Sequence, residues 1–328
     1  MKMLVTGGCG FIGSHFVKRL VAHGAEVVVL DKLTYSGNPA NLDGVPHEFV
    51  HGDIADAAAI GRAGEGCGMV VNFAAESHVD RSILAAGDFI RTDIAGTHVL
   101  LEWVRHTGVR FVQVSTDEVY GDLSGDEAAR EDDPLRPSSP YAASKAGADL
   151  LVLAYVRTYG VDAVITRGSN TYGPFQYPEK MIPLFVTNAL DGEPLPVYGD
   201  GRQRRDWLHV DDHCAAVEVV LDKGETGGVY NVGAGDEREN LDVTRIIIEL
   251  TGADPSLVRH VEDRPGHDRR YALDSSRIAA LGWKAQRAFE DGLAETVMWY
   301  SENRAWWEPL KAGEYRAYYA RQYDERLG

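Results

Sequence analysis

A glycine-rich turn near the N-terminus constrains the fold more than any other feature of the sequence. The turn runs from Gly7 to Gly13, after a short apolar run that ends at Thr6 and before a stretch of apolar residues at helical spacing. A second apolar run, Val27 to Leu30, stops at Asp31. Strand, glycine turn, helix, strand and acid in this order are typical of a dinucleotide-binding unit. The glycines let the backbone approach a pyrophosphate at the helix N-terminus.

Asp31 indicates which dinucleotide the unit binds. A carboxylate at the end of the second strand can accept hydrogen bonds from both ribose hydroxyls and repels a 2′-phosphate. We therefore expect NAD rather than NADP. The glycines alone also fit a tight turn that binds no ligand. The cofactor site is favoured because the strands, the helix and the acid all occur at the positions that such a site requires.

Strand-like and helical stretches alternate through the first half of the chain. Two long helical stretches are expected at residues 88–106 and 141–159. This alternation predicts an α/β fold with a doubly wound parallel (Rossmann) sheet, whose ligand site lies at the carboxyl ends of the strands. The further strand-like runs are 48–51, 69–73, 110–115 and 163–167.

Proline and turn residues become frequent after Gly173, which predicts a second, smaller mixed α/β domain for the substrate. Residues 229–232 form one more strand-like run, so we expect the two domains to interleave in sequence. The predicted NAD-binding domain is 1–170 plus about 207–233, and the predicted substrate domain is about 171–206 plus 234–328.

Composition excludes several functional classes. The chain has 33 basic and 50 acidic residues, a net charge of −17, which repels nucleic acid and anionic membranes. No apolar run approaches the length of a membrane span, and the N-terminus enters a strand directly, so we expect neither a membrane segment nor a signal peptide. Cys9, Cys67 and Cys214 are few and widely spaced, as expected of buried thiols in a reducing compartment. We expect a cytoplasmic enzyme.

The strand-like run 110–115 leads into Thr116, Asp117 and Glu118, where sheets of this kind place reacting groups. Neighbouring strand residues point to opposite faces. The two acids can therefore share one site only if the strand has given way to a loop, as Gly121 permits. In one cleft, repulsion and burial raise at least one pKa and give an acid and a base. The alternative is a pair of solvated loop acids.

Tyr141 and Lys145 lie four residues apart in a predicted helix and so project from one face. A nearby ammonium favours phenolate, and we expect it to lower the pKa of Tyr141 below about 10. Such a tyrosine can remove a hydroxyl proton while hydride leaves the same carbon for NAD. The alternative is a surface cation over an aromatic ring, and Ser115 and Thr116 on the preceding strand favour the catalytic interpretation.

The stretch 72–82 follows another strand-like run. Small residues, Ala74 and Ala75, allow a flat cofactor to approach, and polar residues such as Ser77 can reach its ribose or the substrate. A helix cap with a surface ion pair explains the same spacing equally well.

Together these motifs resemble the extended short-chain dehydrogenase/reductases, and among them the dTDP-glucose 4,6-dehydratases. The resemblance depends most on Asp117, because the related GDP-mannose dehydratases carry serine there and the 4-epimerases lack the Asp-Glu pair. It extends to about residue 300. The matching stretches are 7–13, 31–35, 74–82, 115–121, 141–145, 170–174, 178–180, 205–207, 240–243 and 263–271.

The resemblance implies an NAD-dependent dehydration of dTDP-glucose to dTDP-4-keto-6-deoxyglucose. Tyr141, helped by Lys145 and Thr116, takes the 4-OH proton as hydride moves to NAD. Glu118 then removes the C5 hydrogen, and a protonated Asp117 gives its proton to the departing 6-OH. Hydride returns to C6, so NAD is regenerated in each turnover and stays tightly bound.

The resemblance also implies the binding residues and a homodimer formed through the two long helices. Lys180 and Arg205 suit a diphosphate in an acidic protein, although surface solvation is the alternative for each. The cofactor residues are Gly7, Gly10, Phe11, Ile12, Gly13, Asp31, Lys32, Leu33, Thr34, Asp53, Ile54, Ala74, Ala75, Ser77, Thr92, Tyr141 and Lys145. The substrate residues are Ser77, Thr116, Asn170, Glu179, Lys180, Leu195, Pro196, Val197, Arg205, Asn240, Asp263, Arg264, Pro265, Gly266 and His267.

Two residues depart from the family pattern. Thr171 and Asp93 stand where the family usually has asparagine. Thr171 puts one cofactor contact in question, and Asp93 replaces an amide with a group that can carry charge, but neither belongs to the expected acid, base or hydride relay. His209 and His213 have a spacing that metal ligands use, but they flank the start of a helix and we predict no metal site. A nucleotide-sugar 4-epimerase and a non-catalytic NAD-binding regulator remain the alternative functions. The sequence does not separate a dTDP from a UDP carrier, nor cell-wall rhamnose from a natural-product deoxysugar pathway.

Overall fold

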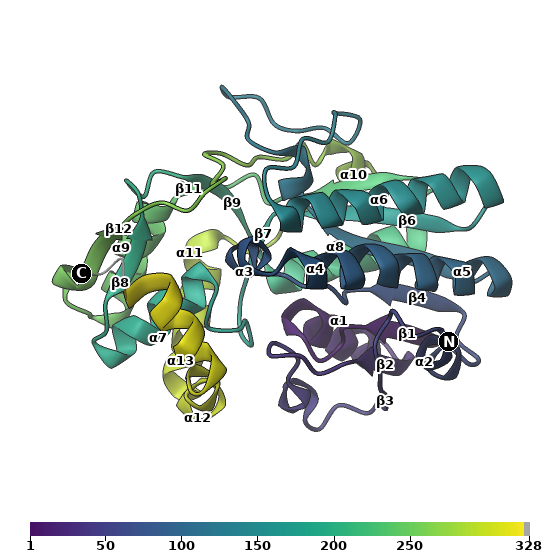
Figure 1. Ribbon diagram of the computed structural model, residues 1–328, viewed down its shortest axis with the longest axis horizontal. Helices are drawn as coiled ribbons and strands as arrows, with labels where there is room; N and C mark the ends of the chain where they lie inside the picture. The colour runs from purple at the N-terminus through teal and green to yellow at the C-terminus, as the bar shows by residue number, and fades with distance from the viewer. Residues whose placement is uncertain (325–328) are drawn as a thin grey trace.

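The computed structural model describes residues 1–324, without the side chains of Glu314 and Asp324 (Figure 1). Its largest element is a seven-stranded sheet in the order β10-β6-β5-β4-β1-β2-β3, in which every neighbouring pair is parallel. The predicted doubly wound sheet is confirmed. Its strands are β1 (Lys2–Thr6), β2 (Glu26–Asp31), β3 (Glu48–His51), β4 (Met69–Asn72), β5 (Arg110–Thr116), β6 (Ala163–Gly168) and β10 (Val229–Val232).

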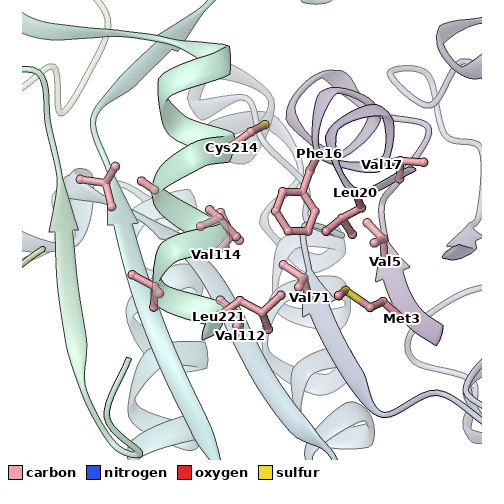
Figure 2. Close-up of a cluster of buried hydrophobic side chains, with 14 of the residues drawn as sticks. Met3, Val5, Phe16, Val17, Leu20, Val71, Val112, Val114, Cys214 and Leu221 are labelled. Carbon is pink, nitrogen blue, oxygen red and sulfur yellow. The ribbon is translucent and has the colours of Figure 1, made fainter. Parts of the chain in front are cut away.

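Both faces of the central strands are buried, which explains why β1, β2 and β4 read as nearly continuous apolar runs, whereas the edge strand β3 is largely exposed. Met3 and Val5 of β1 face α1 (Phe11–Ala22) and α8 (Val210–Lys223), where Phe16 and Leu221 cover them (Figure 2). Leu4, between them in sequence, belongs to the core on the other face, which α2 (Ala57–Ala63), α5 (Thr97–Thr107) and α6 (Pro140–Tyr159) cover. Because helices cover both faces of the sheet, polar side chains can gather only at the ends of its strands.

The helix expected at residues 88–106 is interrupted. The structure has α4 (Ala86–Phe89), a π-helical segment η2 (Ile90–Gly96) and then α5. Thr92 and Asp93 are buried in the π-helical turn. The widened turn aims these two polar side chains inward, and segments of this kind occur frequently at functional sites.

The second expected long helix, α6, begins one residue earlier than predicted. The Ser139 hydroxyl caps it by accepting a hydrogen bond from the Ala142 backbone N–H at 3.1 Å. The helix ends at Gly160, whose φ of +68° is the left-handed conformation that glycine adopts readily. These two ends fix where Tyr141 and Lys145 stand, in the first two turns beside β5.

The second region contains two small sheets. The strands β7 (Asn170–Tyr172), β9 (Arg204–His209) and β11 (Glu237–Glu239) form one, and β8 (Leu195–Tyr198) with β12 (Val258–Val261) forms the other. An aromatic core that includes Trp207, Phe289 and Trp307 packs between these strands and their helices. The helices are α7 (Met181–Asp191), α9 (Asn240–Thr251), α11 (Phe289–Glu302), α12 (Arg304–Trp307) and α13 (Glu314–Tyr319). Short elements elsewhere are η1 (Pro39–Leu42), α3 (Val79–Leu84), η3 (Asp117–Tyr120), η4 (Pro255–Leu257), α10 (Ser276–Ala280), η5 (Pro309–Lys311) and η6 (Ala320–Asp324).

The chain passes between the large sheet and the second region five times. It leaves after β6, returns with α8 and β10, and leaves again for β11. After β11 it returns with α10, which packs against β10, and leaves again with α11. The predicted strand 229–232 is confirmed as β10, which pairs with β6 at the edge of the large sheet. Within residues 1–324, no helix is both long enough and apolar enough to span a membrane.

Candidate active site

Two adjoining cavities lie where the carboxyl ends of the central strands meet the second region. The first runs from the glycine turn past the ends of β4, β5 and β6. The second lies among β8, β9 and the loop before Tyr271. Glu118, Asn170, Glu179 and Lys180 line both cavities. The two spaces therefore meet at a carboxylate, an amide, a second carboxylate and an ammonium.

The glycine turn closes against the neighbouring strand end so tightly that side chains are excluded. Gly7 has φ +67°, and a Cβ there would lie 2.6 Å from the backbone nitrogen of Ala74. A Cβ at Gly13 would lie 2.2 Å from the Gly7 carbonyl oxygen. No side chain caps α1, whose N-cap is Gly10. Its first-turn N–H groups at the cavity wall therefore suit an anionic pyrophosphate.

The end of β2 fits a ribose. The Asp31 carboxylate is buried and accepts a hydrogen bond from the Cys9 N–H at 3.0 Å and from the Leu33 N–H at 2.8 Å. Each oxygen keeps lone pairs for a ribose hydroxyl. Burial raises the pKa of Asp31, and the two backbone donors oppose that rise. Alongside, Lys32 donates to the Thr92 hydroxyl at 3.0 Å and lies 3.9 Å from Asp53. These groups match an NAD site.

Asp117 and Glu118 enter one site because β5 ends at Thr116 and the 3₁₀ turn η3 begins there, as the sequence required. The Thr116 hydroxyl donates to Asp117 Oδ1 at 3.1 Å and accepts from the Glu118 N–H at 3.3 Å. Asp117 is buried, and among residues 1–324 nothing forms a hydrogen bond with its Oδ2. Both carboxyls line the first cavity.

The two acids have raised pKa values, as expected. Burial, followed by the neighbouring Glu118 carboxylate, raises the pKa of Asp117 to about 8. Burial also raises the pKa of Glu118, while the Arg264 guanidinium and the Lys180 ammonium act against that rise. At neutral pH Asp117 is therefore a proton donor. The expectation of a perturbed pair is confirmed.

Tyr141 and Lys145 project from one face of α6 into the first cavity. The Lys145 ammonium is buried and donates to the Val114 carbonyl at 2.7 Å. The expectation of a lowered pKa for Tyr141 is wrong: burial, then the Glu118 and Asp93 carboxylates, raise it well above 10. The desolvation cost of a phenolate and the surrounding negative charge outweigh the effect of the lysine.

Lys180, Arg205 and Arg264 line the second cavity, together with the carboxylates of Asp80, Glu118 and Glu179. Lys180 donates to the Ser77 carbonyl, and Arg264 donates to Asp80 Oδ1 at 2.8 Å. Arg205 is buried, donates to the Asp268 carbonyl at 2.7 Å and lies over the Tyr271 ring. Three cationic side chains around one cavity suit a diphosphate.

The structure brings most of the predicted binding residues together. All predicted cofactor residues except Leu33 line the first cavity, as do Ser77 and Thr116 of the substrate set. Leu33 takes a positive φ of 53° and its N–H turns towards Asp31 instead. In the second cavity lie Asn170, Glu179, Lys180, Pro196, Val197, Arg205, Asn240, Arg264 and His267.

Four predicted substrate residues line neither cavity: Leu195, Asp263, Pro265 and Gly266. Leu195 is fully buried in the core of the second region because alternate residues of β8 point inward. Asp263 accepts hydrogen bonds from His267 Nδ1 at 2.5 Å and from the Gln203 side-chain amide at 2.9 Å, which makes it a support for His267.

Sequence reasoning missed several lining residues. Ser36 and Gly37 lie two and three residues after the predicted Thr34, so extending that motif would have found them. Others have no local signal and reach the cavities only through the fold. They are Gln176, Tyr177 and His213 in the first cavity, and Phe185, Tyr198 and Tyr323 in the second. His78, Asp80 and Trp207 also line the second cavity; they belong to the stretches 74–82 and 205–207 but were not assigned to a site.

The two departures from the family pattern have partners in the structure. The Thr171 hydroxyl lies 2.7 Å from His213 Nδ1. Asp93 accepts from the Ser144 hydroxyl at 2.6 Å and from the Glu76 N–H at 3.1 Å. Burial raises the pKa of Asp93 to about 6, opposed mainly by Lys145. His213 Nδ1 lies beside the Thr171 hydroxyl, and His209 caps α8 by accepting a hydrogen bond from the Asp211 N–H.

A parallel Rossmann sheet with a tyrosine and a lysine four residues apart beside its cofactor cavity defines an extended short-chain dehydrogenase/reductase. Residues 4–296 match the family model described as GDP-mannose 4,6 dehydratase. A dTDP-glucose 4,6-dehydratase of Streptomyces niveus is 53% identical over 324 residues, covering 95% of this chain and 96% of that protein. One of Neisseria meningitidis is 47% identical, covering 100% and 99%. The chain belongs to the dTDP-glucose 4,6-dehydratase family.

Solved structures agree with this membership. DesIV, a dTDP-glucose 4,6-dehydratase from Streptomyces venezuelae with NAD and TYD bound, has a TM-score of 0.93 and 54% identity, covering 95% of this chain and 100% of that one. The Thermus thermophilus UDP-glucose 4-epimerase in complex with NAD has a TM-score of 0.87 and 35% identity, covering 92% and 100%. The fold is shared by dehydratases and epimerases, so residues must separate the two activities.

Proposed function

We propose that this protein converts dTDP-glucose into dTDP-4-keto-6-deoxyglucose, as an NAD-dependent hydro-lyase. The observation that carries the proposal is the buried Asp117–Glu118 pair, which shares a cavity with Tyr141 and Lys145. Epimerisation at C4 needs only the tyrosine and lysine. An acid and a base beside them supply what the removal of water requires in addition. The names and bound NAD of the similar proteins support the same reaction.

Bound NAD would supply the hydride acceptor for C4 and the hydride donor for C6. The residues that would hold it are the glycine turn with its uncapped helix at the pyrophosphate, Asp31 at a ribose, and the wall formed by Asp53 and Thr92. The fit rests on the close approaches at Gly7 and the free acceptor capacity of Asp31 described above.

Tyr141 is the proposed acceptor of the 4-hydroxyl proton. Burial disfavours the phenolate form of Tyr141. The site with NAD and substrate bound therefore needs positive charge near the phenol before Tyr141 can accept the proton. Lys145, on the same face of α6, is the protein's source of that charge, and Thr116 orients the phenol by hydrogen bonding. Oxidation at C4 leaves a ketone next to C5.

Glu118 and Asp117 then remove water. The ketone acidifies the C5 hydrogen, and the Glu118 carboxylate takes that proton. Asp117 holds its own proton at neutral pH and gives it to the 6-hydroxyl oxygen, so the C6–O bond breaks and water leaves. Glu118 then returns a proton to C5 while C6 takes up the hydride that bound NAD would supply. Tyr141 has then gained a proton and Asp117 has lost one, so proton exchange with solvent completes the cycle and restores the enzyme for the next turnover.

The experiment that tests the proposal is incubation with dTDP-glucose without added NAD, followed by mass spectrometry and the absorbance of the product in alkali. Loss of one water with a ketone chromophore supports dehydration and a retained cofactor. An unchanged mass with a galactose isomer overturns it in favour of a 4-epimerase, and no turnover with intact bound NAD favours a regulator. A parallel reaction with UDP-glucose tests the carrier.

We also propose a homodimer formed through α5 and α6, which lie side by side in Figure 1. Ile90 on η2 and Leu150 and Tyr159 on α6 are exposed, which supports this surface as the interface. Sedimentation should give a dimer mass. Leu150→Glu should give a monomer, with Met298→Glu, at an exposed methionine on α11, as the matched control.

The same proposal includes the two interleaved domains with the boundaries predicted from sequence, and a cytoplasmic location without nucleic-acid partners. The strand pairings support the domains, because residues 229–232 join the large sheet. The three cysteines are buried free thiols, which supports a reducing compartment. The net charge of −17 supports the absence of nucleic-acid binding.

A further inference from the structure

The segment that follows β2, residues 33–42, lies against the cofactor cavity, and we name it the strap. Thr34, Ser36 and Gly37 of the strap line the cavity. The Leu33 N–H donates to Asp31, and a Cβ at Gly37 would lie 2.9 Å from Asp31 Oδ1. The strap therefore covers the carboxylate that is expected to hold a ribose.

The far end of the strap is fastened to the glycine turn by a buried amide. Asn41 is only 2% exposed, and its side-chain NH₂ donates to the Cys9 carbonyl at 3.0 Å. The Asn38 backbone N–H donates to the same carbonyl at 3.0 Å. The remaining oxygen of the Asn41 amide accepts a hydrogen bond from the indole N–H of Trp306 at 2.9 Å.

Trp306 comes from α12, beyond the residues that match the family model. Its ring contacts Trp299 edge-on at 5.1 Å and Phe175 at 5.6 Å between centroids. Lys18 of α1 lies 3.7 Å above the Phe175 ring. The indole is thus held by an aromatic cluster of the second region, and its N–H connects that cluster to the strap and, through Asn41, to the glycine turn.

We propose that Trp306 and Asn41 form a latch that holds the strap against the cofactor cavity and slows the release of NAD. This inference rests on the proposed function, because it concerns the cofactor that the reaction regenerates. A hydrogen bond present only while the strap is closed must break before the strap can move away. Losing one such bond should accelerate release by about twofold to tenfold.

The test uses the holoenzyme as purified. Trp306→Phe keeps an aromatic ring in the cluster and removes the N–H together with part of the indole ring, and Trp307→Phe makes the same change in ring size. The NAD dissociation rate is measured by mixing with an excess of alcohol dehydrogenase and ethanol, which convert released NAD into fluorescent NADH. Trp307→Phe is the matched control, because it removes an indole hydrogen bond on the same helix to the Tyr300 carbonyl. Asn41→Ala removes the acceptor of the latch.

Faster release from W306F but not from W307F supports the latch, as does a W306F/N41A double variant that releases NAD no faster than N41A alone. Release from W306F at the wild-type rate overturns it, and so does equal acceleration by W307F, which would indicate general loosening of α12. Wild-type protein that neither carries nor binds NAD would instead overturn the proposed function, so the two failures are distinguishable.

Discussion

Asp117→Asn is the substitution that tests the assignment of the acid most directly. The amide has nearly the shape of the carboxyl and can still accept the Thr116 hydroxyl, but it has no proton to give to the leaving 6-hydroxyl. With a pKa of about 8 in the folded protein, about nine in ten molecules carry the Asp117 proton at pH 7. General acid catalysis contributes about 100-fold to 10,000-fold. We therefore expect water elimination to slow by at least about 100-fold.

Oxidation at C4 uses Tyr141 and Lys145, so it should survive in this variant. Rapid mixing of holoenzyme with dTDP-glucose should give NADH absorbance that persists, while quenched samples show little water loss by mass spectrometry. In the wild type, elimination should fall about tenfold per pH unit above about pH 8, as Asp117 loses its proton. In Asp117→Asn this alkaline decline should be absent.

The matched control is Asp126→Asn, which removes an exposed carboxylate from the loop that follows the same turn. It should eliminate water like the wild type. The reasoning is refuted if Asp117→Asn eliminates water within about tenfold of the wild-type rate, or if its alkaline decline persists.

Three further predictions concern the same site. Glu118→Gln should also keep C4 oxidation and slow water loss by at least about 100-fold, because the C5 proton has lost its acceptor; mass spectrometry showing normal water loss would contradict this. Asp93 has a folded-state pKa of about 6, above the ordinary 3.8, so its contribution to stability is present in full below about pH 4 and is lost as pH rises through 6. Asp93→Asn should therefore increase the free energy of unfolding in urea at pH 8, by at most about 3 kcal/mol, and by less at pH 4. Equal effects at the two pH values would contradict the assignment. Gly13→Ala, whose Cβ would meet the Gly7 carbonyl oxygen at 2.2 Å, should leave the purified protein without NAD. Gly61→Ala in α2, where a Cβ meets nothing within 4 Å, should retain NAD and gain up to about 1 kcal/mol in unfolding free energy.

Features that depend on neighbours in sequence were predictable. Periodicity and spacing located the glycine turn, the strand ends and the Tyr141–Lys145 pair, because each of these motifs lies within a short stretch of sequence. The π-helical turn at Thr92 and Asp93 was not predictable, because apolar residues recur there much as they do in an ordinary helix.

Features that depend on burial or on distant contacts required the fold. The pKa of Tyr141 rises because its surroundings exclude water. The four-residue spacing between Tyr141 and Lys145 contains no information about this burial. Tyr323 and Trp306 reach the second cavity and the strap across more than a hundred residues of sequence. Leu195 was assigned to the substrate site from the family resemblance, although the direction of its side chain follows from its place in β8.

The return of the chain to the large sheet has a consequence for any attempt to exchange or isolate its parts. α8 covers a face of the sheet that includes Val112 and Val114, and β10 completes its edge. A fragment ending at Tyr172 would therefore expose that apolar face to water instead of folding as an autonomous NAD carrier. Transplanting the sugar-recognition half from a relative would require several separate grafts, each with its own junctions. No single junction in the sequence therefore separates the residues of the cofactor cavity from those of the substrate cavity.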